Sequence, residues 1–206
     1  MRTVLEEIKI FDSAAKLSAA FTAATTDIIT SAAHGLSNED LIQVSSATTL
    51  PAGLSASTDY YVRDVTTDTF KVSATMNGEA VNITDTGTGV HTFVLKGKKV
   101  LISDASTFVL NLHTAGSANF TIQVQVSSQE DVDFNATASA TNRYELLQIV
   151  DGDSGTKYSG TTGYAFTGTD KDLSFELNTG GRRWMTVLVS GWSAGTLMAK
   201  ASLYGN

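Results

Sequence analysis

The chain has 206 residues, enough for one large domain or two small ones. Its 14 Lys and Arg stand against 21 Asp and Glu, a net charge of −7, and basic residues this scattered argue against a nucleic-acid-binding face. The absence of Cys excludes disulfides, thiolate metal sites and cysteine nucleophiles, and no apolar run reaches the roughly 18 residues of a membrane-spanning helix.

Residues 3–24 at the N-terminus fit two interpretations. Their charged residues and many Ala favour a helix, whereas Ile8 and Ile10 fit one face of a strand. We expect a strand over residues 4–11, followed by a looser Ala-rich link. Residues 1–20 are therefore assigned as a strand or arm of a larger sandwich.

Alternating apolar and polar residues recur along the rest of the chain, most clearly in Phe120–Ser127. Side chains alternate across a strand, so this spacing buries one face and leaves the other in water. Turn clusters rich in Gly, Asn and Asp separate the runs, and we find no place for the crossover helices of a parallel α/β sheet. The other strands predicted on this basis cover residues 41–45, 60–65, 69–73, 81–84, 91–95, 108–113, 144–150, 173–178, 184–190 and 197–203.

Composition changes near Ala20 and near residues 96–99 divide the chain. Residues 21–97 hold the only Pro and a Gly-rich end, with about five short strands, as a small β module would. Residues 98–206 carry the cleaner strands and are expected to form the main core. The predicted fold is all-β: an antiparallel, jelly-roll-like β-sandwich with a small inserted β-barrel-like module. The expected large core residues of the sandwich are Phe120, Tyr144, Phe166, Phe175 and Trp184.

Residues 22–93 contain short motifs in a fixed order. They are Ala33–Ser37 (Ala-His-Gly-Leu-Ser), Asp40–Val44, Leu50–Leu54, Thr58–Val62, Asp68–Lys71 and the Gly-Thr-Gly-Val-His turn Gly87–His91. In this order they resemble a small β module that is frequent in bacteriophage virion proteins.

The flanking sequence carries a second set of motifs. They are Ile8–Ala14, Ser117–Gln125, Thr141–Tyr144, Asp151–Gly155, Thr162–Ala165 and Phe175–Asn178. Their order is similar to that of small β-sandwich virion proteins of tailed phages, which resemble capsid decoration (cement) proteins or other accessory virion components.

This resemblance implies a non-enzymatic structural protein of the virion, on the capsid surface, that stabilises the head by bridging capsid subunits. It implies a homotrimer whose partners are the major capsid protein or other virion proteins, without cofactor, nucleic acid or membrane. One alternative is a tail, baseplate or adaptor component. Another is a receptor- or carbohydrate-binding virion module. The residues that we expect at an interface are Ile8, Ile10, Phe11, Tyr61 and Trp192.

Histidines offer little sign of metal chemistry. His34 and His91 could form a metal pair, but both lie in turns of the module, where hydrogen bonds to local backbone are the favoured role. His113 occupies an outward position of an alternating strand, which favours exposure to solvent or to an interface. We therefore predict no metal site.

Acidic residues suggest two further sites. Asp151-Gly152-Asp153 resembles the start of a calcium loop, but Gly155 and Thr162 stand where the later ligands belong, which favours a hairpin turn. The cluster of Glu130, Asp131 and Asp133 is interpreted as a solvated loop. Because no nucleophile, base and orienting group can be assembled, we predict that the protein is not an enzyme.

Overall fold

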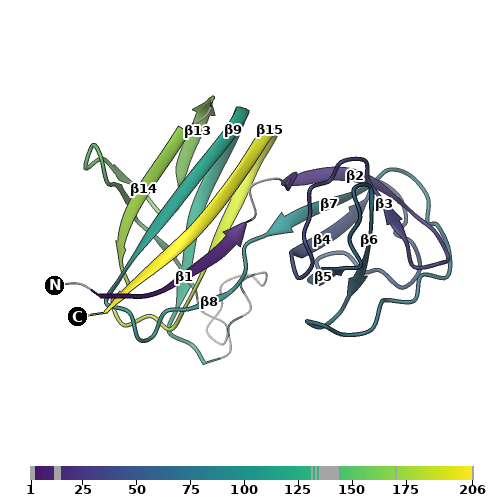
Figure 1. Cartoon of the computed structure of the whole chain (residues 1–206), viewed down its shortest axis with the longest axis horizontal. Coiled ribbons are helices and arrows are strands. Elements are labelled where there is room, and N and C mark those ends of the chain that lie inside the picture. Colours follow the sequence, from purple (N-terminus) through teal and green to yellow (C-terminus); the bar gives the residue numbers. More distant parts are fainter. Residues whose placement is uncertain are drawn as a thin grey trace. The chain divides into compact units, whose positions relative to one another are not determined.

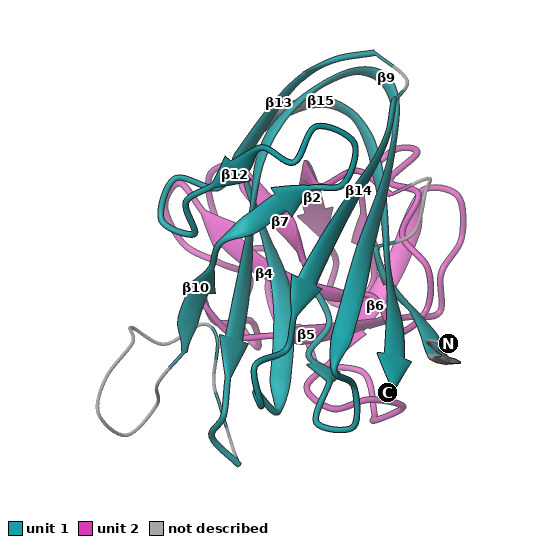
Figure 2. Cartoon of the chain, turned by 90° about the vertical axis from the view of Figure 1, so that its left-hand side faces the viewer, with its two compact units in different colours: residues 1–13, 97–206 teal, residues 14–96 magenta. Residues whose placement is uncertain are grey.

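The structure is a computed structural model that describes residues 3–11, 15–130, 132, 134, 144–169 and 171–205. These residues form strands, turns and bends, and none of them is in a helix. The chain forms two compact units (Figure 2), one of residues 1–13 with 97–206 and one of residues 14–96. Because the described part contains no helix, it has none that could span a membrane.

Residues 14–96 form a closed, antiparallel six-stranded barrel with the strand order β2-β3-β6-β5-β4-β7 (Figure 1). Its strands are β2 (Ser18–Ala23), β3 (Ile29–Thr30), β4 (Leu41–Ser46), β5 (Tyr60–Arg63), β6 (Thr69–Ser73) and β7 (His91–Lys96). The pairing of β2 with β7 closes the barrel, and it begins at Ser18 opposite Val94. The barrel unit therefore starts before Ala20, earlier in the chain than the boundary expected from composition.

Alternating side chains fill the barrel, as the sequence predicts. Phe70 of β6 and Phe93 of β7 lie at its centre, edge to face, with ring centroids 5.9 Å apart. The strand expected over residues 81–84 is wrong: Ile83 is buried, but its N–H donates to the Asp27 side chain rather than to a neighbouring strand. Local alternation marked the buried residue correctly but could not show which group its backbone would bind.

The other unit is a nine-stranded antiparallel sheet. Six of its strands follow the order β1-β15-β9-β14-β11-β12, and the other three pair at the side: β8 with β15, and β10 and β13 with β9. Its strands are β1 (Thr3–Phe11), β8 (Val100–Leu101), β9 (Thr107–Ser127), β10 (Glu145–Leu147), β11 (Ile149–Asp151), β12 (Lys157–Tyr158), β13 (Tyr164–Gly168), β14 (Lys171–Asn178) and β15 (Trp184–Gly205). Strand β1 confirms the strand expected over residues 4–11. The loose Ala-rich link expected after it is wrong for Ser18–Ala23, because this segment forms β2 of the barrel.

Two long strands carry this sheet through both layers of a sandwich. The first half of β9 pairs with β14, and its second half pairs with β13 and β10. Strand β15 follows β9 along both halves, with its register shifted between Ser190 and Thr196. Figure 2 shows these strands arching over at one end, so that one sheet folds back on itself. Tyr164 of β13 meets Phe175 of β14 across the layers, with ring centroids 5.0 Å apart.

The sandwich core confirms most of the expected large residues. Phe120, Phe166 and Phe175 are buried, and Phe120 stacks on Phe166. Trp184 and Tyr144 are only half-buried, so their assignment to the core is wrong. For Trp184 the reason is alternation, because its neighbour Met185 takes the inward position. The fold as a whole confirms the predicted all-β sandwich with an inserted barrel.

Candidate functional site

The sandwich unit carries a hollow of about 380 Å³, which we call the sheet hollow, on the outer face of the layer that contains β14. It is formed where β9, β14 and β15 lie side by side, with Asp153 from the β11–β12 turn at its margin. Outward residues stand in two rows across these strands, because residues that pair in register point to the same face. The rows are Asp172–His113–Met198 and Ser174–Asn111–Lys200.

Two exposed ion pairs organise the charges of the sheet hollow. His113 Nδ1 lies 2.7 Å from Asp172 Oδ1, with the two side chains 45% and 87% exposed. Lys200 Nζ donates to Glu7 Oε1 at 2.9 Å, which joins β15 to β1. Exposed pairs of this kind contribute at most about 1 kcal/mol to stability. Their role is to hold polar groups in place on the sheet, and His113 is exposed as predicted.

The sheet hollow offers hydrogen-bond donors and acceptors. Asn111 and Ser174 stand beside each other in one row, next to the Lys200 ammonium. Among the hydrogen bonds of the described residues, none joins the Ser174 hydroxyl to His113, whose Nδ1 contacts Asp172 instead. A polar ligand is what this lining could hold.

A second, larger hollow of about 670 Å³ lies where residues 104–107 meet residues 178–181. Thr179 is 3% exposed, and its hydroxyl donates to the carbonyl oxygen of Ala105 at 2.8 Å. Its backbone N–H binds Ser106 O at 3.2 Å. These bonds join two loops of the sandwich, so the polar groups here serve the fold.

The barrel histidines make separate contacts. The Nδ1 atom of His34 accepts a hydrogen bond from the Leu36 N–H at 2.9 Å. The His91 ring lies 2.9 Å from Ser46 Oγ through Nδ1 and 3.0 Å from Thr86 O through Nε2. The role in a turn that the sequence favoured is thus confirmed for His34, whereas His91 is the first residue of β7 and one of its contacts is the Ser46 side chain of β4. In the described parts of the chain, no three His, Asp or Glu side chains are grouped so as to hold a metal ion.

The Asp151–Gly155 segment is a hairpin turn, as favoured over a calcium loop. Asp151 Oδ1 accepts hydrogen bonds from the N–H groups of Asp153 at 2.9 Å and Ser154 at 3.0 Å. The Ser154 N–H is the largest cause that lowers the pKa of Asp151. Of the acidic cluster, Glu130 is exposed and its carbonyl oxygen accepts a bond from Trp184 Nε1, while Asp131 and Asp133 lie outside the described residues.

Aspartates that fix the backbone of loops, within one loop or between two, are the feature that the sequence analysis missed. In the barrel, Asp68 Oδ1 accepts from Ala33 N at 2.8 Å and Asp40 Oδ2 from Ser37 N at 2.8 Å. Asp85 Oδ1 accepts from Ala52 N at 2.8 Å and from a second N–H in its own turn. Both Asp68 and Asp40 belong to the ordered motifs, and an Asp beside turn residues was the available signal.

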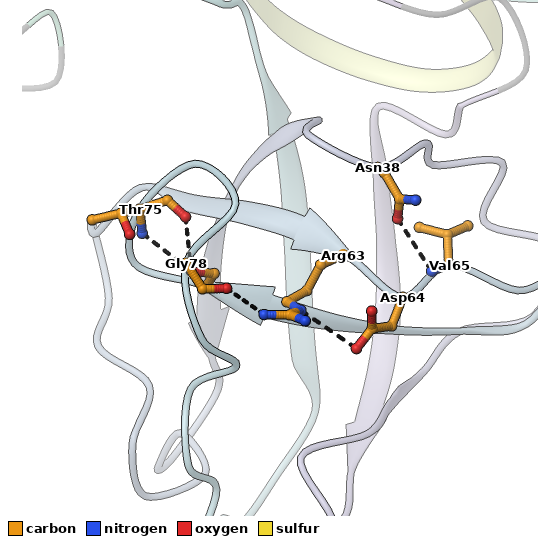
Figure 3. Close-up of polar contacts among 7 residues, drawn as sticks. Asn38, Arg63, Asp64, Val65, Thr75 and Gly78 are labelled. Atoms are coloured by element: carbon orange, nitrogen blue, oxygen red, sulfur yellow. Dashed lines mark hydrogen bonds and ion pairs between the residues drawn. The ribbon is translucent and has the colours of Figure 1, made fainter.

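Arg63, at the end of β5, ties down a second barrel loop (Figure 3). Its Nη1 donates to the Gly78 carbonyl oxygen, and its Nε lies 3.4 Å from Asp64 Oδ2. The Gly78 N–H in turn donates to Thr75 O at 3.0 Å. A Cβ at Gly78 would collide with the Thr75 and Ser73 hydroxyls, so a larger residue there would have to displace both. The Arg63 guanidinium therefore has a structural partner on each side.

The residues expected at an interface differ in accessibility. Ile10 and Phe11 are 2% and 1% exposed, because β1 packs both into the sandwich itself. Ile8 is half-buried beside Ala201, and Tyr61, in the barrel, is also half-buried. Trp192 is half-buried at the bend of β15, where its Nε1 donates to Gly195 O at 3.3 Å. Ile8, Tyr61 and Trp192 are thus the members that a partner could still reach.

Strand β1 stands at one end of the sheet order, with β15 as its partner among the described strands. Its exposed residues include Glu6, Glu7 and Lys9, charges that disfavour uncontrolled pairing at a sheet edge. These features complete the geometry from which a function can be argued. No protein-family model matches the chain, and neither curated proteins nor solved structures gave a match.

Proposed function

We propose that this protein is a non-enzymatic structural protein of a tailed-phage virion that decorates the capsid surface and bridges capsid subunits. The observation that supports the proposal most is the edge position of β1 in an all-β sandwich. An edge strand presents backbone N–H and C=O groups that a strand of a neighbouring protein can pair with. Such contacts bind by shape and repetition and need no catalytic group.

Loops of the barrel that are fixed by aspartate hydrogen bonds support the same function. The Asp68, Asp40 and Asp85 bonds hold barrel loops in fixed positions, and a rigid surface loses little conformational entropy when a neighbour binds it. Many copies of one weak contact hold collectively, since each bound site raises the effective concentration of the next. Homotrimers on a capsid would multiply contacts in this way, with the major capsid protein or other virion proteins as partners.

Purified virions that contain this chain provide the test. Cryo-electron microscopy should show density of its size at positions of capsid symmetry, and mass spectrometry of intact particles should give hundreds of copies. Density confined to the tail, or a dozen copies or fewer, would replace the capsid placement by the tail or baseplate alternative. Light scattering of the purified chain should give three times 21.7 kDa if it is a trimer.

The sheet hollow supports a second candidate function, a carbohydrate-binding virion module. Its volume is within the range of small-ligand sites, and Asn111, Ser174 and Lys200 offer the hydrogen bonds that sugar hydroxyls require. The same chain could carry this site and a structural role. Glycan-array screening of the whole chain tests the candidate, and the absence of binding to any glycan would reject it.

A further inference from the structure

The loop between β3 and β4, residues 31–40, contains a buried histidine, His34. His34 is 1% exposed, and its ring stands edge-on to Phe70 with centroids 5.0 Å apart. The loop is held by the Leu36 N–H bond to His34 Nδ1 and by the Lys16 N–H bond to His34 O at 2.9 Å. The imidazole is thus a core side chain that also holds the loop in place through its hydrogen bond.

The hydrogen bond from Leu36 fixes the protonation state of this ring. An N–H that points at Nδ1 requires a lone pair there, so the proton of the neutral ring resides on Nε2. The buried Nε2 has no hydrogen-bond partner in the structure. A second proton would have to sit on Nδ1, where it would face the Leu36 N–H instead of an acceptor, so protonation breaks this hydrogen bond.

The charged groups around His34 do not reverse this balance. Burial is the largest effect and lowers the pKa of His34 below its ordinary value, and the Lys16 ammonium lowers it further. The carbonyl groups of Thr69 and Thr66 and the Asp68 carboxylate oppose these effects. Asp68 is also committed to the loop, since its Oδ1 accepts from Ala33 N at 2.8 Å.

The other two histidines of the chain lack this conflict. His91 Nδ1 faces the Ser46 hydroxyl, which can accept as well as donate, and its Nε2 faces the Thr86 carbonyl oxygen, so neither ring nitrogen faces a backbone N–H. His113, in the sandwich, is exposed beside the Asp172 carboxylate. Mild acid should therefore act at His34.

We propose that protonation of His34 in mild acid releases residues 31–40 and opens this end of the barrel while the sandwich stays folded. In the open loop His34 regains an ordinary pKa near 6.5, so the open state binds more protons than the closed state. The stability that the closed loop gains from a neutral His34 is complete above about pH 6.5 and declines as the pH falls below it. If the closed ring stays neutral, opening is favoured by about 30-fold at pH 5.

Hydrogen exchange of the full chain, followed by mass spectrometry at pH 7.5 and pH 5.0, tests the proposal. Exchange times are corrected for the intrinsic effect of pH on amide exchange. Peptides covering residues 31–40 should lose protection by up to about 30-fold at pH 5.0, whereas peptides from β9 and β15 should change less than twofold. Unchanged protection of residues 31–40 would overturn the proposal, as would equal loss in both units.

Two variants separate His34 from the other groups that titrate. In His34→Asn the amide oxygen can accept the Leu36 N–H but cannot ionise, so the acid response of residues 31–40 should disappear. His113→Asn, at the exposed pair, should leave that response unchanged. An acid response that persists in His34→Asn would overturn the proposal.

A measurement on the unchanged chain covers the case in which His34→Asn does not fold. Nuclear magnetic resonance can follow the His34 ring and the Leu36 amide through the same pH titration. The ring should gain its proton together with the loss of Leu36 amide protection, at a pH below 6.5. A ring that titrates while Leu36 stays protected would overturn the proposal.

Discussion

Two glycines at the bend of the sandwich sheet provide a matched test of how closely its strands approach. Gly195 has φ of +78° and Gly191 has φ of +63°, so alanine at either position is strained by its backbone. A Cβ at Gly195 would lie 2.8 Å from the Cβ of Ala118 and 3.0 Å from the carbonyl oxygen of Ala115. Nothing lies within 4 Å of a Cβ at Gly191. Only Gly195→Ala therefore adds a collision.

The left-handed conformation costs a residue with a side chain about 1–2 kcal/mol. Overpacking adds about 1–3 kcal/mol when the atoms in the way belong to backbone and cannot rotate aside. Gly191→Ala should thus lower the free energy of unfolding by about 1–2 kcal/mol, and Gly195→Ala by about 2–5 kcal/mol. With a urea dependence near 2 kcal/mol per molar, the two midpoints should differ by roughly 0.5–1.5 M.

Tryptophan fluorescence during urea unfolding reports the unfolding of the sandwich unit alone. Trp184 and Trp192 are the only Trp of the chain, and both belong to the sandwich, so the signal does not report the barrel. Equal midpoints for the two variants would refute the close approach of β15 to Ala118, and with it the way the sheet folds over. A larger loss in Gly191→Ala would refute it as well.

Three further changes test the other features. Thr179→Val removes the hydroxyl that binds Ala105 O in a buried site, so the free energy of sandwich unfolding should fall by about 1–2 kcal/mol, and a change below about 0.5 kcal/mol in the tryptophan assay would contradict this role. Asp85 has a pKa lowered by N–H donation from Ala52 and then Gly87, so its stabilisation of the barrel is complete well above the ordinary carboxyl pKa and is lost as the pH falls toward the lowered value. Asp85→Asn should remove that part of the acid response, seen as hydrogen exchange of residues 50–54 between pH 5 and pH 3. Under the carbohydrate-binding candidate, Asn111→Ala should abolish glycan-array binding without changing the urea midpoint, and binding that survives would exclude the sheet hollow as the site.

The sequence by itself determined the fold class, because side-chain alternation is a local property of a strand. Phe120 and Phe175 could be assigned to a core from their own neighbours, and both are fully buried. The same alternation predicts that Trp184 points outward, because Met185 and Val187 take the inward positions. Its assignment to the core followed from the size of the ring and not from its position in the pattern. The turn role of His34 could also be predicted, since a His beside Gly in a loop favours local hydrogen bonds.

Only the tertiary structure decided which distant segments meet. Residues 108–113 and 120–127 were predicted as separate strands, yet they are halves of β9, and the same alternate side chains face the core from Phe108 to Val126. The burial of His34 depends on Phe70, and the role of Asp68 depends on Ala33, 35 residues away. Alternation specifies which face of a strand is apolar but carries no information on its partner, because pairing and loop closure are settled by the packing of the whole chain.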